Sequence, residues 1–403
     1  MSARNDAIIY SLGSVLAKVI PLLTIPYLTN KLGVEKYGEL SISISWAALI
    51  LCFTLFSLDS ACVRYYYRYG KRNGNEIITI SIVASSMIFV SLFLVTYLYG
   101  SDESLTIATL LAFNQSIFTI TASKLNFSKN AKGFISIQML NAILAFSLTL
   151  IFFELKEVSV NERLYAIFVA YWISSLVCYF LFGFNQNKRR LFRLFKPFLI
   201  YSFSFGLPLL IHNISFVLKG NFDRVVINGA FSSIELGFYA LGAQLASIFG
   251  VLILSINKAL VPHVYEKIKN GTLESHMLVK YSMVFYPISI FIFLISMLVP
   301  SSFFEYAFGE GFAASSYYFS MFTFSVFLSV PYLVVVNYLF YHGMTKVIAK
   351  LNIVSTLVYL ILVWVFSNIG MKYIPIASII SSVILSMLVI SKVYRYGDIK
   401  IQS

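Results

Sequence analysis

The chain has 403 residues, of which 59% are hydrophobic and 12% are charged. The surface of a soluble globular protein needs about a quarter charged residues, so this composition excludes a soluble globule and indicates a protein of the lipid bilayer. We attribute the formal net charge of +13 to membrane topology and to contact with anionic lipid headgroups, and not to nucleic-acid binding.

Twelve apolar segments are long enough to cross a bilayer as helices, which takes about 20 residues because the backbone polar groups must pair within the segment. In chain order they are residues 7–29, 41–61, 77–99, 105–122, 134–153, 164–184, 198–218, 236–261, 281–299, 317–340, 348–366 and 373–393. The first follows Arg4 as the core of a signal peptide would, but no small-residue cleavage pattern precedes Lys31, so we interpret it as a retained helix. The sequence therefore predicts an all-α integral membrane protein with about 12 transmembrane helices.

Lysine and arginine are distributed unevenly among the connections. We assign 21 of the 30 to the N-terminus and the even-numbered connections with their helix ends and six to the other connections; the remaining three are Lys18, Lys219 and Lys258. Cytoplasmic connections of membrane proteins are rich in these residues, so we expect both termini in the cytoplasm. The six on the opposite side are Lys31, Lys36, Lys156, Arg163, Arg224 and Lys372.

The two halves of the chain share a plan. Residues 10–41 read as a helix, a short connection that contains glycine, and the opening of a second helix, and residues 201–240 repeat this order. Six helices per half is an even number, so the halves would share one orientation and enclose a cavity between them. We therefore expect two six-helix bundles that form a parallel pseudo-repeat, residues 1–190 and 191–403.

Patterns typical of catalysis and metal binding are missing from the sequence. The three cysteines lack ligand-like spacing, the four histidines are scattered, and no connection exceeds about 20 residues. Neither a catalytic triad, nor a Walker loop, nor a dinucleotide-binding glycine pattern is present. We therefore predict a transporter without a metal or a resident cofactor, and leave open whether protons or another cation are coupled to transport.

Short motifs along the whole chain resemble those of a known family. They are Tyr10-Ser11-Leu12-Gly13, residues 21–29, Leu32-Gly33, Tyr37-Gly38, Leu207-Pro208 with His212, Asp223-Arg224, Gly237-Phe238-Tyr239-Ala240 and Phe308-Gly309-Glu310-Gly311-Phe312. They resemble the bacterial O-antigen flippases of the multidrug/oligosaccharidyl-lipid/polysaccharide exporter superfamily. The resemblance implies an inner-membrane protein of lipopolysaccharide biosynthesis with two six-helix bundles around a cationic lumen. Its cargo would be an undecaprenyl-pyrophosphate-linked oligosaccharide, moved from the cytoplasmic to the periplasmic leaflet.

Lys18 is the first candidate residue of such a lumen. It lies about 11 residues into the first span and, at ~1.5 Å per residue, near the bilayer midplane. An ionisable side chain at that depth costs at least ~2.5 kcal/mol, so it usually faces a cavity; the alternative is a lysine paired inside its bundle. Pro21 and Pro26 interrupt the backbone hydrogen bonds of this helix and predict a bend, either a hinge or a static kink.

Arg64 is the candidate for substrate capture. Asp59 and Arg64 close the second span on the cytoplasmic side, and Arg68 follows one turn later on nearly the same face. A guanidinium group is well suited to pyrophosphate. The alternative is an anchor at the membrane interface, which the neighbouring tyrosines favour for Arg68.

Five candidates come from the second half. His212 lies within the seventh span, Lys219, Asp223 and Arg224 cluster at its outer end, and Lys258 lies toward the inner end of the eighth. A polar cluster at the outer end would release the substrate, and a titrating His212 would couple protons. Each has a structural alternative: the two lysines reach the interface by snorkelling, Asp223 pairs with Arg224, and His212 is a hydrogen-bonded buried residue.

Gln138 and Asn141 are the neutral candidates for sugar recognition. They are three residues apart in the fifth span, which places them on one helix face. Hydrogen bonds between transmembrane helices use the same side chains, so a purely structural role is the alternative.

Three other functions stay open. A multidrug or cation antiporter of the same superfamily would need carboxylates within the spans, where Asp59 near one end is the only one. A major-facilitator transporter would carry a glycine-rich motif in the second connection, and a membrane polymerase of glycan assembly would carry acidic or arginine-bearing outer loops. Expected partners are the lipid-linked oligosaccharide and anionic lipids, with the glycan polymerase machinery as a third candidate.

Overall fold

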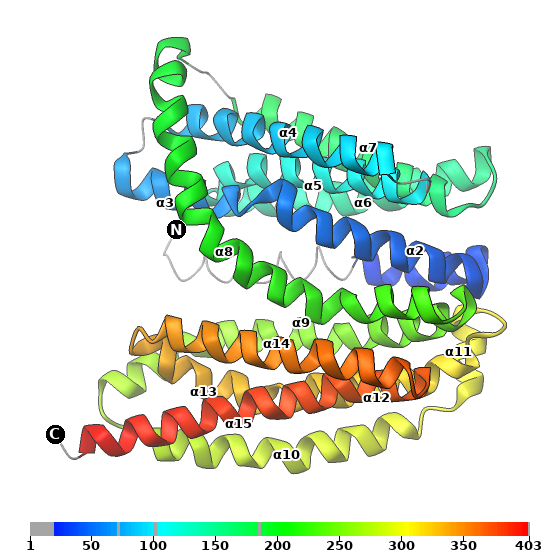
Figure 1. The fold of residues 1–403 in the computed structure, drawn as a ribbon, viewed down its shortest axis with the longest axis vertical. Coiled ribbons are helices and arrows are strands. Elements are labelled where there is room, and N and C mark those ends of the chain that lie inside the picture. The colour runs from blue at the N-terminus through cyan, green and yellow to red at the C-terminus, as the bar shows by residue number, and fades with distance from the viewer. Residues whose placement is uncertain (1–19, 71–72, 100–102, 184–186, 402–403) are drawn as a thin grey trace. The chain divides into compact units, whose positions relative to one another are not determined.

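The computed structural model describes residues 20–70, 73–99, 103–183 and 187–401, and it is all-α, as predicted (Figure 1). The helices of the first part are α2 (Ile25–Leu55), α3 (Leu58–Tyr69), α4 (Gly74–Tyr99), α5 (Glu103–Phe127), α6 (Ala131–Leu155), α7 (Val160–Leu181) and α8 (Lys188–Ala230). Those of the second part are α9 (Ser233–Lys269), α10 (Ser275–Met297), α11 (Ser301–Phe308), α12 (Ser315–Leu328), α13 (Val330–Tyr341), α14 (Thr345–Ser367) and α15 (Ile374–Ile401), with short 3₁₀ turns at Phe312–Ala314 and Met371–Tyr373.

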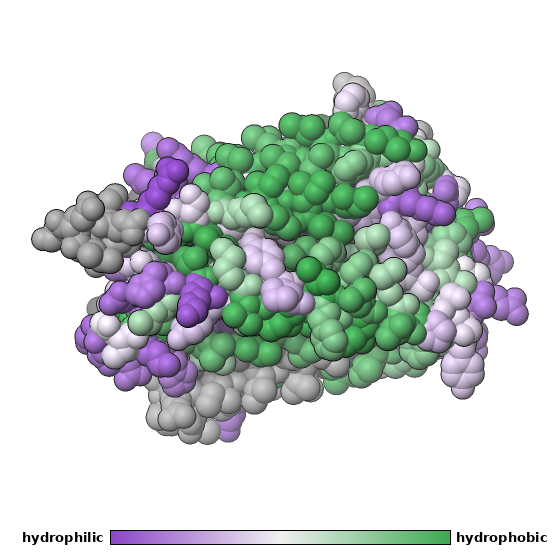
Figure 2. All heavy atoms as spheres, turned by 90° about the horizontal axis from the view of Figure 1, so that it is seen from below, coloured by the Kyte–Doolittle hydropathy of each residue, from purple (hydrophilic) through white to green (hydrophobic). Residues whose placement is uncertain are grey.

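Eleven helical stretches of the described chain are long and apolar enough to cross a membrane. They coincide with the second to twelfth predicted spans, while most of the first, residues 7–29, lies outside the described residues. The helices run past the predicted ends, as α8 does at Lys188, because backbone hydrogen bonding continues into the polar headgroup region after the apolar run has stopped. On the face drawn in Figure 2, apolar side chains form a broad band with hydrophilic residues gathered at its two ends.

The chain divides into two compact units. The first comprises Met1–Thr24 and Glu39–Asn221, and the second comprises Ile25–Gly38 and Phe222–Ser403, so α2 and α8 each contribute to both. The predicted division at residue 190 remains a prediction about the repeat, since the boundary between the compact units lies inside α8.

Each unit is built around one helix. In the first unit α5 packs against α3, α4, α6 and α7, and in the second α12 packs against α9, α10 and α15. These central helices belong to the fourth and tenth predicted spans, which are equivalent positions in a repeat of six helices. The packing is therefore consistent with the parallel pseudo-repeat.

The predicted connection between the first two spans is a kink at Gly33, where two helices meet, and not an extended loop. Gly33 alone leaves helical geometry inside α2, with φ 72° and ψ 176°, a conformation that glycine adopts at little steric cost. A second interruption lies earlier, at Thr24, which keeps a helical φ of −82° and ψ of −12°, and Pro26 occupies the first turn after it, where a missing N–H costs nothing. Pro26 thus follows an interruption between two helical stretches, where a proline disturbs the backbone hydrogen bonds; Pro21 lies in the stretch before Thr24, and a bend or hinge at either proline remains a prediction.

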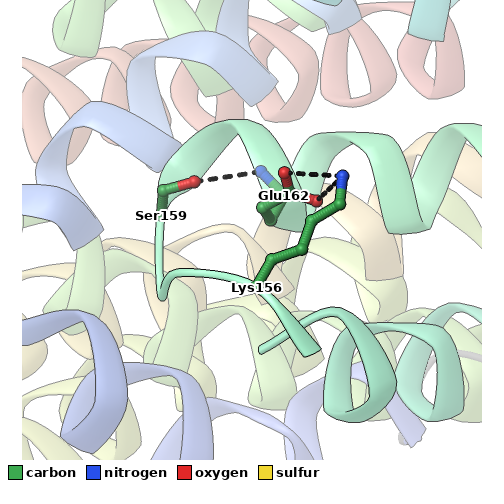
Figure 3. Close-up of polar contacts among 3 residues, drawn as sticks. All are labelled: Lys156, Ser159 and Glu162. Atoms are coloured by element: carbon green, nitrogen blue, oxygen red, sulfur yellow. Dashed lines mark hydrogen bonds and ion pairs between the residues drawn. The ribbon is translucent and has the colours of Figure 1, made fainter. Parts of the chain in front are cut away.

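The connection between α6 and α7 is held by an ion pair and a helix cap (Figure 3). Lys156 Nζ lies 3.0 Å from Glu162 Oε1, and the Ser159 hydroxyl accepts a hydrogen bond from the Glu162 N–H. Arg163 is buried and donates to the Ala145 carbonyl oxygen at 2.9 Å and to the Thr149 hydroxyl. Two of the six basic residues expected on the outer side thus have partners within the first unit.

Candidate functional site

A break between α2 and α3 shapes the inside of the first unit. Phe56 and Ser57 adopt left-handed conformations in succession, with φ 44° and 56°, at a cost of about 1–3 kcal/mol each for residues that are not glycine. The sequence predicted one uninterrupted helix over residues 41–61. The chain instead changes direction within that span, and α3 carries Asp59 and Arg64 away from the axis of α2.

Helix α8 holds this break in place. The side-chain amide of Asn213 donates to Ser57 Oγ at 3.1 Å, and the ring of Phe203 lies 4.9 Å from the ring of Phe56. A Cβ atom on Gly206 would lie 2.6 Å from the Phe56 carbonyl oxygen, so only glycine allows this approach. Phe203, Gly206 and Asn213 are spaced by three and seven residues and share one face of α8. That face compensates the strain of the break.

A pocket of about 380 Å³ opens where α3, α5 and α6 meet. Its lining residues recur at helical spacing, at 59, 60, 63 and 64 on α3, at 119, 122, 123 and 126 on α5, and at 134 and 138 on α6. Each helix therefore presents a single face to the space. The polar members are Asp59, Ser60, Arg64, Thr119, Ser123, Asn126 and Gln138.

The two charged side chains of this pocket form no ion pair within the described part of the chain. The Arg64 guanidinium lies over the rings of Phe205, at 4.6 Å, and Tyr201, at 5.9 Å. Such cation–π contacts hold the group by its face and leave its N–H donors available at the edge. Asp59 lies in the first turn of α3, where the helix dipole favours an anion, and accepts a long hydrogen bond of 3.4 Å from Ser60 Oγ.

The structure brings together two of the predicted site residues and separates a third. Arg64 and Gln138 line the same pocket. Asn141 instead accepts a hydrogen bond from Ser174 Oγ of α7 at 3.5 Å. Gln138 and Asn141 thus have different neighbours, because three residues on a helix still differ by about 60° in direction, and a shared role in sugar recognition remains a prediction.

The candidates of the second half are dispersed. Asp223 is buried and accepts hydrogen bonds from the Tyr239 hydroxyl and, at 2.8 Å, from the Arg224 backbone N–H, which favours its structural interpretation. His212 and Lys258 are exposed, and Lys219 is half-buried on α8. Lys18 lies outside the described residues.

Several motif residues that carry the family resemblance converge on one junction in the second unit. A Cβ on Gly38 would lie 2.0 Å from the Ser233 carbonyl oxygen, and a Cβ on Gly237 would lie 2.2 Å from that of Val34. The start of α2 and the start of α9 thus touch backbone to backbone, a mode of helix packing common in membranes.

The turn after α11 joins this junction. The Asn30 amide donates to the Ala307 carbonyl oxygen at 3.4 Å, and the rings of Tyr37 and Phe312 meet edge to face at 5.9 Å. Gly309 and Gly311 have positive φ, 105° and 88°, which explains the two glycines of the motif. These motif residues pack the fold and do not line the pocket.

Four pocket residues escaped the sequence reasoning: Ser60, Thr119, Ser123 and Asn126. The last three recur on α5 at spacings of four and three residues, and this polar stripe in an apolar span was the available signal. Serine and threonine are common in transmembrane helices for packing reasons. The polar stripe on α5 therefore indicates a site only because Asp59 and Arg64 line the same pocket.

The chain is similar to known proteins over most of its length. A family model described as "Polysaccharide biosynthesis protein" matches residues 3–267. "Lsg locus putative protein 1" of Haemophilus influenzae is 34% identical over 384 residues, which cover 95% of this chain and 96% of that protein.

Solved structures share the fold. An inward-facing multidrug resistance MATE family transporter of the MOP superfamily matches with a TM-score of 0.72 at 14% identity, over 96% of this chain and 99% of that one. The lipid II flippase MurJ, in an inward closed conformation, matches with a TM-score of 0.72 at 15% identity, over 96% of this chain and 87% of that one. At this identity the likeness extends to the fold alone.

Proposed function

Because the chain belongs to the polysaccharide biosynthesis protein family, we propose that it transports a lipid-linked oligosaccharide from one leaflet of a membrane to the other. The family match over residues 3–267 carries this proposal. The fold does not discriminate, since a multidrug transporter and a lipid II flippase match with the same TM-score of 0.72. A family of polysaccharide biosynthesis favours a saccharide cargo over a drug.

The proposed cargo is an undecaprenyl-pyrophosphate-linked repeat unit, such as an O-antigen unit. Its proposed direction is from the cytoplasmic to the periplasmic leaflet of the bacterial inner membrane. The orientation follows from the 21 Lys and Arg of the N-terminus and even-numbered connections against six opposite. With this orientation the pocket of α3, α5 and α6 lies toward the cytoplasm, on the side where the cargo is made.

Transport would proceed by alternating access. The headgroup enters near Arg64, cationic groups such as Lys18 neutralise it on its way, and the two bundles rock to open outward. His212, Lys219 and Lys258 are further proposed contacts on this route. The lipid tail stays in the bilayer throughout, so only the polar headgroup needs an aqueous path.

The membrane potential supplies a driving force for this direction. Moving one negative charge outward is favoured by about 2.3 kcal/mol per 100 mV when the inside is negative. Two uncompensated charges on a pyrophosphate would therefore gain about 4.6 kcal/mol per 100 mV. An exchanged proton or cation would change this sum.

The proposal is tested with the purified chain in proteoliposomes that contain a fluorescently labelled lipid-linked oligosaccharide. A membrane-impermeant quencher reports the fraction of label in the outer leaflet. We expect the label to equilibrate between leaflets at a rate that depends on the protein and grows with an imposed potential. Equal rates with and without protein would reject the flippase.

A multidrug or cation antiporter is the second candidate. Asp59 favours it, because this carboxylate within a span has no ion-pair partner among the described residues. The same proteoliposomes loaded with a fluorescent organic cation separate the two functions. Cation efflux without movement of the glycolipid would establish the antiporter.

A further inference from the structure

The pocket of α3, α5 and α6 holds polar groups that the protein leaves unused. Within the described part of the chain, the side-chain amides of Asn126 and Gln138 form no hydrogen bond, and the Arg64 guanidinium makes only ring contacts. Arg64 and Asn126 are exposed, whereas Gln138 is half-buried, and polar groups removed from water nearly always have partners in folded proteins. A half-buried amide without a hydrogen bond, beside exposed polar groups that line the same defined space, points to a ligand.

The pocket offers both hydrogen-bond donors and hydrogen-bond acceptors to a ligand. Thr119 Oγ1 donates to the Gln115 carbonyl oxygen at 2.8 Å and Ser123 Oγ donates to that of Ile120 at 2.7 Å, so their oxygens remain as acceptors. The Asp59 carboxylate adds further acceptors, the Arg64 guanidinium adds donors, and each amide offers both. A sugar hydroxyl also donates and accepts, whereas a phosphate oxygen at neutral pH chiefly accepts.

The charge of the pocket favours the sugar part of a lipid-linked glycan over its pyrophosphate as the occupant. One arginine and one aspartate give formal neutrality, so a pyrophosphate placed here would bring an uncompensated negative charge beside Asp59. Two like charges at close range repel each other, which disfavours the pyrophosphate at this place. A sugar ring needs no counter-charge, and the ring of Phe134, which lines the same space, offers an apolar wall to its C–H face.

We propose that this pocket binds one sugar residue of the transported glycan and excludes the pyrophosphate, which binds elsewhere on the route. The volume of about 380 Å³ falls within the ~300–1,000 Å³ of small-molecule sites. This proposal rests on the proposed function for the identity of the cargo. It assigns Arg64 to sugar hydroxyls or a single sugar carboxylate, and not to pyrophosphate capture.

The test is saturation-transfer difference NMR on the full chain in detergent, with methyl glucoside, methyl N-acetylglucosaminide and methyl glucuronoside as probes. We expect a signal from at least one glycoside, weakened about fivefold or more in Gln138→Leu, because a lost hydrogen bond is worth about that factor. The control is Gln115→Leu, the same substitution at a half-buried glutamine of the same unit that does not line the pocket. Sodium pyrophosphate in excess is expected to leave the signal intact.

Four results would overturn the proposal: no signal from any glycoside, an equal loss in Gln138→Leu and Gln115→Leu, displacement of the glycoside by pyrophosphate, or normal flipping by Gln138→Leu. The third would assign the pocket to the anion. Flipping measured on the same variants separates this proposal from the function it rests on. Normal flipping by Gln138→Leu would contradict the sugar site but not the flippase function. No flipping by the wild type would contradict the flippase function itself.

Discussion

Replacing Gly237 by alanine tests whether the motif glycines act by packing. The added Cβ would lie 2.2 Å from the Val34 carbonyl oxygen, a backbone atom that no rotamer change can move. Ordinary contact begins at 3.4 Å, so the start of α2 must withdraw by about 1.2 Å, the difference of the two distances. Overpacking of this kind costs about 1–3 kcal/mol, while alanine gains about 0.5–1 kcal/mol over glycine inside a helix. We expect a net loss near 2 kcal/mol, because backbone contacts relax least.

The matched control is Gly250→Ala in the same helix, where the nearest atom to the new Cβ is Val326 Cγ1 at 3.9 Å. Denaturation of the purified full-length variants in mixed micelles measures the difference. Gly237→Ala is expected to unfold at a lower denaturant fraction than the wild type, and Gly250→Ala at the same or a higher one. If both variants were as stable as the wild type, the backbone contact between α2 and α9 would not exist in the protein.

Three further substitutions test individual contacts. Tyr239→Phe is expected to cost about 2 kcal/mol, because it strips a hydroxyl partner from the buried carboxylate of Asp223; additivity with Asp223→Asn in a double-mutant cycle would contradict this pairing. Arg163→Met is expected to cost about 1–3 kcal/mol in unfolding free energy, since it removes the hydrogen bonds that join α7 to α6; an unchanged unfolding midpoint would count against them. Lys18→Glu is expected to abolish flipping while membrane insertion stays normal, and normal flipping by that variant would reject its place in the lumen.

The spans were predictable from sequence because long apolar runs leave no alternative to helix in a bilayer. The break at Phe56 and Ser57 was not, since neither residue is glycine or proline. Its cause lies in Asn213, 156 residues away from Ser57, and in the space that Gly206 leaves. Strain of this kind depends on a tertiary contact that no local pattern reveals.

The site was predictable only residue by residue. Arg64 and Gln138 each stand out as polar groups at the end of or within an apolar run, but their meeting depends on the direction that α3 takes after the break. The motif glycines Gly38 and Gly237 were recognised through a resemblance. Their role, which is to let the backbones of α2 and α9 approach closely, depends on the packing of two helices that are far apart in sequence.

The sidedness of lipid-linked oligosaccharide in cells that lack this protein tests the central claim most directly. A periplasmic glycan probe compares these cells with the wild type. We predict that complete lipid-linked units accumulate on the cytoplasmic face and that the probe loses its signal. Units that reach the periplasmic face unpolymerised would indicate a polymerase, and unchanged sidedness of the glycolipid would contradict the flippase.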